Sequence, residues 1–398
     1  MLPLQGVRVV DLSRLLAGPF CTMILADLGA DVVKVEALPD GDLYRKSAPF
    51  HGGESVSFLA VNRNKRSIAI DFRKAGGLDL VRDMVERADV LVENFKPGTM
   101  ENMGLSYERL CALNPRLIYA GISGFGRVGP YGELPGVDQI AQGMSGFMSI
   151  TGQPLTGPTR VGVPIGDLVA GMWTAIGVQS ALLARQATGK GQRIDMSLLG
   201  GLIGLLSVQG QRWLSLRDTP SVAGNHHPVS SPYGLFHASD GVFNLSATTS
   251  AMWERLCDHL QMPELKNDER FSTGATRLAN RNELEKLLDE RFSQRSRDEW
   301  ICELRSLGMP AGPVYDLSEV FSDKGILSNG VIETIAHPTI GQLDQLASPL
   351  KMECFANGSV RSPPPLLGEH TRQILDELGY DDRHIADLER MRVIPAKP

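Results

Sequence analysis

The sequence predicts an α/β protein whose first part is a doubly wound parallel sheet. Short apolar strands alternate with helices from the N-terminus to about residue 216. A turn-rich stretch then leads into a more charged, mainly helical region that ends near residue 329. Strand and helix patterns mix again in the last residues, 330–398. We therefore expect a large α/β domain starting with 1–216, a smaller, mainly helical α+β domain over 217–329, and a C-terminal segment, 330–398.

The N-terminal residues form a βαβ unit. An apolar strand over residues 7–10 is followed by Gly18-Pro19, which suits the start of a helix because Pro favours early helical positions. Gly29 ends that helix, and residues 31–36 are the next strand. The same alternation predicts strands over 67–71, 89–93, 117–120 and 193–196, and helices over 77–87, 97–103 and 107–113.

The remaining elements are less regular. Residues 135–147 are expected to form a loop that leads into a helix, 149–162 a loop, and 198–214 a second apolar helix. The turn-rich residues 221–234 indicate a functional loop or domain junction. After it we expect strands over 242–247, 331–335 and 350–352, and helices over 250–260, 281–294, 297–307, 372–378 and 382–390.

A buried helix follows Gly166-Asp167. No charged residue interrupts Leu168 to Ala184, and small residues recur at helical spacing. This run is shorter than the ~20 residues that cross a bilayer, so we expect no membrane span. Asp167 stands where the helix should begin, which suits an N-cap. It also suits a nucleophilic carboxylate, because a helix N-terminus favours the ionised form. Both roles are compatible.

Composition excludes several classes of protein. The net charge of −6 over 398 residues offers no basic footprint for nucleic acid or an anionic membrane. The five cysteines are scattered, without a metal-binding cluster, and the N-terminus lacks a signal-peptide pattern. We therefore expect a cytoplasmic protein with no metal site.

Two motifs have ordinary explanations. Gly124–Gly129 matches G-x-G-x-x-G, but Pro130 and a loop follow it where phosphate binding needs a helix, so a turn is expected. His226 and His227 are adjacent and diverge, which disfavours joint metal binding. They suit either a surface loop or a loop that recognises an acid near a pocket.

Basic residues in loops near the early strands would suit a phosphate-rich ligand if they met at one sheet edge: Arg14, Lys65, Arg66, Arg73 and Lys96.

A set of motifs in order along the chain resembles the family III CoA-transferases, which include formyl-CoA and carnitine CoA-transferases. The matching residues cover nearly the whole length: Leu4-Gln-Gly-Val-Arg-Val-Val-Asp-Leu-Ser13, Ala17-Gly-Pro19, Leu28-Gly-Ala-Asp-Val-Val-Lys-Val-Glu36, Asn64-Lys-Arg-Ser-Ile68 with Asp71, Asp89-Val-Leu-Val-Glu-Asn-Phe95, Pro97-Gly98, Pro115-Arg116, Gly189-Lys-Gly-Gln192 and Pro365-Leu-Leu-Gly-Glu-His-Thr371.

The resemblance implies a fold and a mechanism. Family members are interlocked homodimers with a Rossmann-like large domain built from both chain ends and a small domain. Their nucleophile is an aspartate in a Gly-Asp at a helix start, which is Asp167 here. CoA and acyl-CoA are substrates, with no permanently bound cofactor. Backbone N–H groups at the helix start are expected to stabilise each oxyanion. The residues expected around CoA are Leu15, Leu16, Ala17, Ile70, Arg73, Asn94, Phe95 and Lys96.

Departures from the motifs of the formyl-CoA transferases narrow the range of expected substrates. Leu16 replaces a glutamine of the formyl-CoA transferases, Asn102 replaces a CoA-binding arginine, and the His226-His227 loop stands where their glycine-rich lid lies. We therefore expect succinyl-CoA as donor and a small dicarboxylate such as itaconate, mesaconate or citramalate as acceptor, with His226 or His227 as a substrate ligand. Two alternatives remain. The related 2-methylacyl-CoA racemases have a histidine where Val137 stands here, and a non-catalytic acyl-CoA-binding protein would not need Asp167.

Overall fold

The computed structural model describes residues 1–355 and 358–396. The chain divides into two compact units. The large unit consists of Met1–Phe147, Arg160–Asp218 and Leu327–Pro398, and the second unit of Met148–Thr159 and Thr219–Ile326. Residues 148–159, which we expected in the large domain, lie in the second unit, where the Gly224 N–H donates a hydrogen bond to Gly152 O at 3.1 Å.

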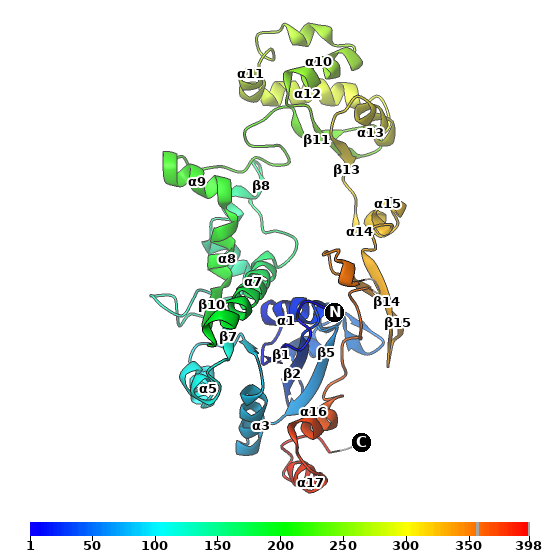
Figure 1. The fold of residues 1–398 in the computed structure, drawn as a ribbon. Helices are drawn as coiled ribbons and strands as arrows, with labels where there is room; N and C mark the ends of the chain where they lie inside the picture. Colours follow the sequence, from blue (N-terminus) through cyan, green and yellow to red (C-terminus); the bar gives the residue numbers. More distant parts are fainter. Residues whose placement is uncertain (356–357, 397–398) are drawn as a thin grey trace. The chain divides into compact units, whose positions relative to one another are not determined.

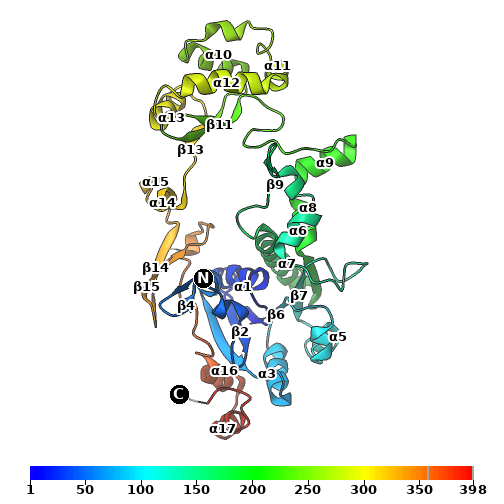
Figure 2. The ribbon, with the colours of Figure 1, turned by 180° about the vertical axis from the view of Figure 1, so that it is seen from behind.

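A six-stranded, fully parallel sheet organises the large unit, in the order β10-β7-β6-β1-β2-β5 (Figures 1 and 2). The chain starts at β1, builds the sheet outward through β2 and β5, and then returns to the other side of β1 with β6. This is the doubly wound order, and the predicted α/β fold on a parallel sheet is confirmed. The strands are β1 (Arg8–Asp11), β2 (Asp31–Ala37), β5 (Lys65–Ile70), β6 (Val90–Glu93), β7 (Ile118–Ser123) and β10 (Arg193–Ser197).

Helices cover both faces of this sheet. Successive strand residues point to opposite faces, so Val9 packs with one helical layer and Val10 with the other. Val9 faces α1 and α7, whereas Val10 faces a layer that includes the two C-terminal helices (Figures 1 and 2). The first layer is α1 (Ala17–Asp27) and α7 (Ile165–Thr188); the second is α3 (Ala75–Glu86), α5 (Tyr107–Leu113), α16 (Thr371–Leu378) and α17 (Asp382–Arg390).

Helix α7 corrects one expectation. It has 24 residues and is long and apolar enough to cross a membrane, so the argument from length was wrong. The core helix of a water-soluble protein passes the same test, and Ala175, Val178 and Ala181 are buried here against α1 and the sheet. The second apolar helix is also not continuous. It divides at Ser207, whose φ is +42°, into α8 (Leu198–Leu205) and α9 (Ser207–Leu216).

The rest of the large unit is made of short elements. Gly124–Gly129 forms bends without a following helix, as expected, and residues 350–352, expected as a strand, lie outside any strand. The other predicted strand of this segment, over residues 331–335, is present. It begins one residue later, at Ile332, and forms one arm of a hairpin. These elements are η1 (Leu43–Lys46), β3 (Phe50–His51), β4 (Glu54–Ser55), α2 (Val56–Leu59), α4 (Thr99–Asn102), α6 (Asp138–Met144), β14 (Ile332–His337), β15 (Gly341–Leu346) and η4 (Glu353–Phe355).

The second unit packs helices on an antiparallel sheet of three strands, β11-β12-β13. Its core is aromatic: Phe292 meets Phe236, Phe243 and Trp300 edge to face, an arrangement that aromatic rings favour. Its elements are η2 (Met148–Ile150), β8 (Gly152–Gln153), β9 (Gly157–Pro158), β11 (Tyr233–His237), β12 (Val242–Ser246), α10 (Ser250–His259), η3 (Pro263–Lys266), α11 (Gly274–Ala279), α12 (Arg281–Phe292), α13 (Arg297–Ser306), β13 (Ala311–Pro313), α14 (Leu317–Val320) and α15 (Lys324–Leu327).

Candidate active site

A pocket of about 210 Å³ lies in the large unit where the sheet changes its direction of winding. Leu15, Leu16 and Ala17 follow the carboxyl end of β1, and Asn94 to Lys96 follow the carboxyl end of the adjacent β6. Ligands of open α/β sheets bind at such a switch point, outside the carboxyl ends of the strands. The first turn of α7 supplies Asp167 to the same pocket. The structure therefore brings together the expected nucleophile and six of the eight residues expected around CoA.

Asp167 lies inside α7 and does not cap it. The helix begins at Ile165 with Pro164 as its N-cap, so the expectation that Asp167 is the N-cap was wrong. Within the described residues, the Asp167 carboxylate has no hydrogen-bond or ion-pair partner. A carboxylate without a partner is free to attack, and Asp167 lies in the first turn, near the positive end of the helix dipole.

The surroundings of Asp167 favour its neutral form. Burial, and secondarily the negative charge of Asp138, raise its pKa from 3.8 to about 7. Near neutral pH the group is therefore divided between acid and carboxylate. A carboxylate held at such a pKa is a stronger base than an ordinary aspartate, which is a common property of reactive groups in active sites.

Asp138 is a site residue that the sequence analysis did not select. It begins α6, and its two carboxylate oxygens have separate tasks. One accepts the Gly166 N–H at 2.7 Å and so anchors the start of α7; the other accepts the Gln142 amide at 2.7 Å. Gln142 Oε1 in turn accepts the Val161 N–H at 2.9 Å. The sequence signal was an aspartate after a Gly-rich loop, which is no more specific than a helix start.

Most of the N–H groups at the start of α7 are already bonded. The Ile165 N–H donates to Val163 O at 2.8 Å, that of Gly166 to Asp138, and that of Leu168 to Pro164 O at 3.1 Å. Within the described part of the chain, the Asp167 N–H alone among these four has no partner. The expectation of several backbone oxyanion donors at this helix start is corrected to one.

Asn94 and Phe95 hold the loop after β1 in place. Asn94 accepts the Arg14 N–H at 2.8 Å and donates to Arg14 O at 2.7 Å, and the Arg14 guanidinium lies 4.6 Å from the centre of the Phe95 ring. The next residue, Leu15, has a φ of +65°, a conformation that costs free energy for any residue with a side chain. The loop therefore needs contacts that fix it in this shape.

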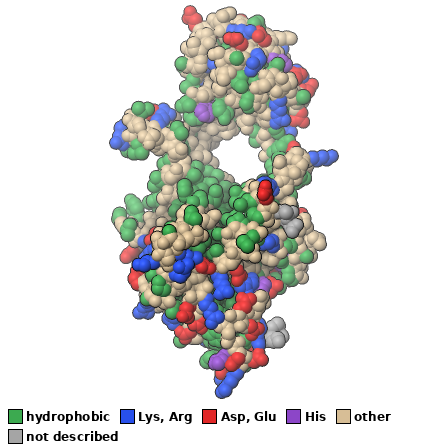
Figure 3. Space-filling view, viewed as in Figure 1, with side chains coloured by type: hydrophobic (Ala, Val, Ile, Leu, Met, Phe, Trp, Pro, Cys, Tyr) green, Lys and Arg blue, Asp and Glu red, His purple; other side chains and the backbone are tan. Residues whose placement is uncertain are grey.

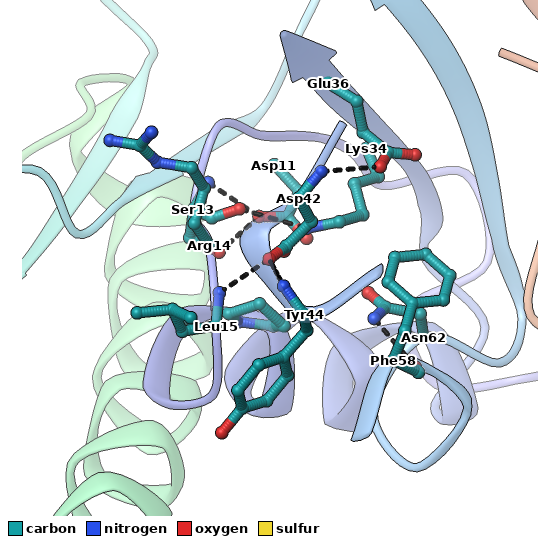
Figure 4. A network of polar contacts seen from close by, with 12 residues as sticks. Asp11, Ser13, Arg14, Leu15, Lys34, Glu36, Asp42, Tyr44, Phe58 and Asn62 are labelled. Carbon is teal, nitrogen blue, oxygen red and sulfur yellow. Dashed lines mark hydrogen bonds and ion pairs between the residues drawn. The ribbon is translucent and has the colours of Figure 1, made fainter. Parts of the chain in front are cut away.

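A buried network beneath the loop supplies such contacts (Figure 4). Asp42 Oδ1 accepts the N–H groups of Leu15 and Tyr44 at 3.0 and 2.9 Å, while its Oδ2 pairs with Lys34 Nζ at 2.8 Å. Lys34 also donates to Ser13 O at 3.0 Å. Asp42 therefore fixes two pocket residues, Leu15 and Tyr44, and Lys34 fixes Asp42.

Asp11 ends β1 and lies in the same network. It accepts hydrogen bonds from Ser13 and from Thr22 Oγ1, the latter at 2.6 Å, and pairs with Lys65 Nζ at 3.2 Å. Burial alone would raise its pKa, but Lys65, Lys34 and the two hydroxyls outweigh burial and lower it. Asp11 is thus a fixed negative charge that orders the loop.

Ile70 and Arg73, the other two residues expected around CoA, do not line this pocket. Ile70 is fully buried in the core between the sheet and α3, so its side chain has no surface for a ligand. The Arg73 side chain is 77% exposed, bonds to Asp71 at 2.8 and 2.9 Å, and does not line the pocket. Ile70 is the last residue of β5 and Arg73 follows that strand, which lies at the edge of the sheet and away from the switch point between β1 and β6.

Both candidate substrate histidines have contacts inside the second unit. His226 Nδ1 lies 2.9 Å from Glu285 Oε1, and its ring meets Phe236 edge to face. The His227 ring stacks on Tyr233 with centroids 4.7 Å apart, and its Nδ1 accepts the Val229 N–H at 3.4 Å. These contacts order the loop of residues 224–233.

Comparison with known proteins assigns the chain to a family. The family model described as CoA-transferase family III matches residues 4–371. A mouse succinyl-CoA:glutarate CoA-transferase is 40% identical over 390 residues, which cover 98% of this chain and 89% of the mouse protein. A succinyl-CoA:mesaconate CoA-transferase from Haloarcula hispanica is 38% identical over 387 residues, covering 94% and 96%.

Solved structures agree with this assignment. The crystal structure of a CAIB/BAIF family protein from Brucella suis superposes with a TM-score of 0.86 at 42% identity, and the match covers 95% of this chain and 99% of that one. The resemblance inferred from the motifs is therefore confirmed. The chain is a CoA-transferase and belongs to CoA-transferase family III.

Proposed function

We propose that this enzyme transfers CoA from succinyl-CoA to a small dicarboxylate, with Asp167 as the covalent carrier. The observation that supports it most directly is the unpartnered, largely buried Asp167 carboxylate at a pocket flanked by residues 15–17 and 94–96. Relatives named for succinyl-CoA with glutarate, mesaconate or D-citramalate support the choice of substrates. A relative named acetyl-CoA:oxalate CoA-transferase, 40% identical over 318 residues, shows that a shorter acceptor belongs in the test.

The chemistry runs through four covalent steps. The ionised Asp167 oxygen attacks the acyl carbon of the donor thioester, the C–S bond breaks, and CoA leaves as thiolate, giving an aspartyl anhydride. The thiolate attacks the Asp167 carbonyl carbon, which frees the donor acid and leaves an aspartyl-CoA thioester. The acceptor carboxylate attacks that carbon and expels the thiolate again. The thiolate then attacks the acceptor's acyl carbon, which releases the new thioester and Asp167.

Racemisation is the second candidate function, and the pocket disfavours it. Val137 stands where the racemases place a histidine, and no histidine lines the pocket among the residues that the structure describes. Among the described residues, the pocket therefore lacks the histidine with which those racemases move an α-proton. A 2-methylacyl-CoA incubated in deuterated water should gain no α-deuterium; rapid exchange without any acceptor acid would reverse this choice.

The experiment that tests the transfer is a paired screen. Succinyl-CoA and acetyl-CoA are each offered with glutarate, itaconate, mesaconate, citramalate, oxalate and a monocarboxylate of matched length, and the new thioesters are identified by mass spectrometry. We expect the highest kcat/KM with succinyl-CoA and a four- or five-carbon dicarboxylate. A clear preference for a monocarboxylate or for oxalate would contradict the proposed acceptor class.

We propose that the loop of residues 224–233 recognises the distal carboxylate of the acceptor, through His226 or His227. A histidine supplies a hydrogen bond or a positive charge near neutral pH. Changing that histidine to Ala should raise KM for dicarboxylates about 10-fold, the loss expected from a hydrogen bond to a charged group, and should leave monocarboxylates nearly unaffected. Wild-type KM values in both single variants would place recognition elsewhere.

We also propose that the enzyme is a homodimer. Helix α7 exposes large apolar side chains on the face turned away from the sheet, and α8 and α9 continue them; Figure 3 shows hydrophobic side chains gathered over this region. A contiguous apolar surface of this kind marks an interface, and a second copy fits the interlocked dimers that the family resemblance implies. These residues are Met172, Trp173, Ile176, Leu183, Ile203, Val208, Trp213, Leu214 and Leu216. Sedimentation at nanomolar concentration should show a dimer, and a folded, active monomer would refute it.

A further inference from the structure

The reaction needs more stabilisation of negative charge than the helix start provides. Each attack on an acyl carbon creates a tetrahedral intermediate whose oxygen carries the charge, and fixed hydrogen-bond donors aimed at that oxygen are a main source of rate enhancement. The start of α7 retains one unbonded N–H in the described part of the chain, that of Asp167, because Asp138, Val163 and Pro164 occupy the others. A second donor must come from another wall of the pocket.

Four residues that line the pocket have side-chain donors: Tyr44, Asn94, Lys96 and Ser123. Asn94 is occupied by both backbone groups of Arg14. Ser123 Oγ donates to Met196 O at 3.4 Å and accepts the Gly126 N–H at 3.0 Å. Lys96 is exposed on the loop after β6. The Tyr44 hydroxyl has no hydrogen bond to any described residue, so it is a neutral donor that the fold leaves unused.

The structure holds Tyr44 firmly while leaving its hydroxyl free. Its N–H donates to Asp42, the ion-pair partner of Lys34, and its ring packs in a small apolar cluster with Leu16 and Leu168. Leu168 directly follows Asp167. In Figure 4 the Tyr44 ring extends from the network with the hydroxyl directed away from Asp42. The side chain is thus positioned by the hydrogen bond of its backbone to Asp42 and by the apolar cluster against which its ring packs.

The charges around Tyr44 keep it protonated. Burial, and then the negative charges of Asp167, Asp42 and Asp138, raise the pKa of its hydroxyl. The group is therefore an O–H donor near neutral pH. Tyr44 lines the same pocket as Asp167 and Asp138, which is the pocket where the acyl carbon must react with Asp167.

We propose that Tyr44 is a further catalytic residue, whose hydroxyl donates a hydrogen bond to the carbonyl oxygen of the reacting acyl group together with the Asp167 N–H. This inference rests on the proposed function of Asp167. The bond strengthens as the oxygen becomes negative and weakens as the carbonyl reforms. The proton stays on Tyr44 throughout; the leaving group is the CoA thiolate in the first and third steps and a carboxylate in the second and fourth. The ligand class is an acyl thioester or aspartyl anhydride.

Tyr44→Phe tests the proposal, because it removes the hydroxyl and keeps the ring that packs in the apolar cluster around Leu16. Loss of one oxyanion donor should lower kcat about 100-fold and leave KM for the acyl-CoA nearly unchanged. Rapid-quench measurement of hydroxylamine-sensitive label on Asp167 should show slower acylation by the same factor. The matched control is Tyr107→Phe, on helix α5 against the opposite face of the sheet, which should behave as wild type.

Several outcomes would overturn this role. A Tyr44→Phe enzyme with wild-type acylation shows that the hydroxyl does not contact the reacting oxygen. A rise in KM for the acceptor acid with unchanged kcat makes it a specificity residue, and a shifted acid limb of the pH profile makes it a partner of Asp167. If Asp167→Ala retains activity and wild type gives no adduct on Asp167, the proposed function fails independently of Tyr44. Equal melting temperatures of wild type and Tyr44→Phe exclude a folding defect.

Discussion

Asp11 and Asp167 are both largely removed from water, and their pKa values move in opposite directions. Asp11 meets two lysines and two hydroxyls, which hold its pKa below the ordinary value. Asp167 meets an apolar wall and a second carboxylate, which raise its pKa to about 7. The partners therefore distinguish the two roles. A buried carboxylate surrounded by cations stays ionised and orders the chain, whereas a buried carboxylate without cations has a raised pKa and is more reactive.

Removing the reactive carboxylate should have the largest effect. Asp167→Ala eliminates the covalent carrier, so CoA exchange should fall by about 10³-fold or more while CoA binding persists. Hydroxylamine added after acyl-CoA should modify Asp167 in wild type and leave the variant unmodified. Asp40→Ala, at the exposed turn after β2, is a control that should retain activity. An Asp167→Ala enzyme with most of its activity would remove this residue from the chemistry.

Removing a cation that pairs with Asp11 should lower the free energy of unfolding. Lys65→Met leaves Asp11 buried with one lysine fewer, and breaking a buried ion pair in this way typically costs about 3–5 kcal/mol. Urea denaturation should show the loss, and the double variant Asp11→Asn with Lys65→Met should recover part of it. No recovery in the double variant would mean that Lys65 acts through its bonds to Pro19 O and Asn62 instead.

The charge of Asp167 should itself destabilise the fold. Its pKa is near 3.8 in the unfolded chain and about 7 in the folded protein, so folding favours the protonated acid. The resulting loss of stability begins as the pH rises above the unfolded pKa and is complete above the folded pKa. Asp167→Asn should therefore raise the free energy of unfolding more at pH 8 than at pH 5. An equal gain at both pH values would show that Asp167 is not desolvated.

A smaller change should come from Asp138. Asp138→Asn keeps an oxygen for the Gly166 N–H but removes the negative charge that helps raise the pKa of Asp167. The acid limb of kcat/KM should shift to lower pH, by less than the full displacement because burial is the larger cause. Gln142→Leu is the comparison, since it disturbs the other Asp138 oxygen and leaves the charge in place. An acid limb that stays fixed in Asp138→Asn would assign the whole effect to burial.

The amino-acid sequence by itself determined the α/β fold and the leading candidate nucleophile. Strand and helix periodicities are local, which is why α5 and α17 have the predicted bounds, and the motif series identified the family and pointed to Asp167. Local sequence patterns are insufficient where contacts with residues distant in the sequence decide the structure. Asp167 looked like an N-cap, but Asp138 draws Gly166 into the helix. Ile70 and Arg73 lie at and after the end of β5, outside the pocket that holds Asp167, and their contact with CoA stays a prediction.

Only the tertiary structure brought the working surroundings of Asp167 together. Tyr44 and Asp138 lie 123 and 29 positions before it in the chain, and nothing in their own sequence context distinguishes them from other tyrosines and aspartates. The order of the strands places the loops after β1 and β6 side by side, and α7 crosses that edge with its first turn. Burial and the placement of charges depend on those distant contacts, so the reactivity of Asp167 is a property of the fold.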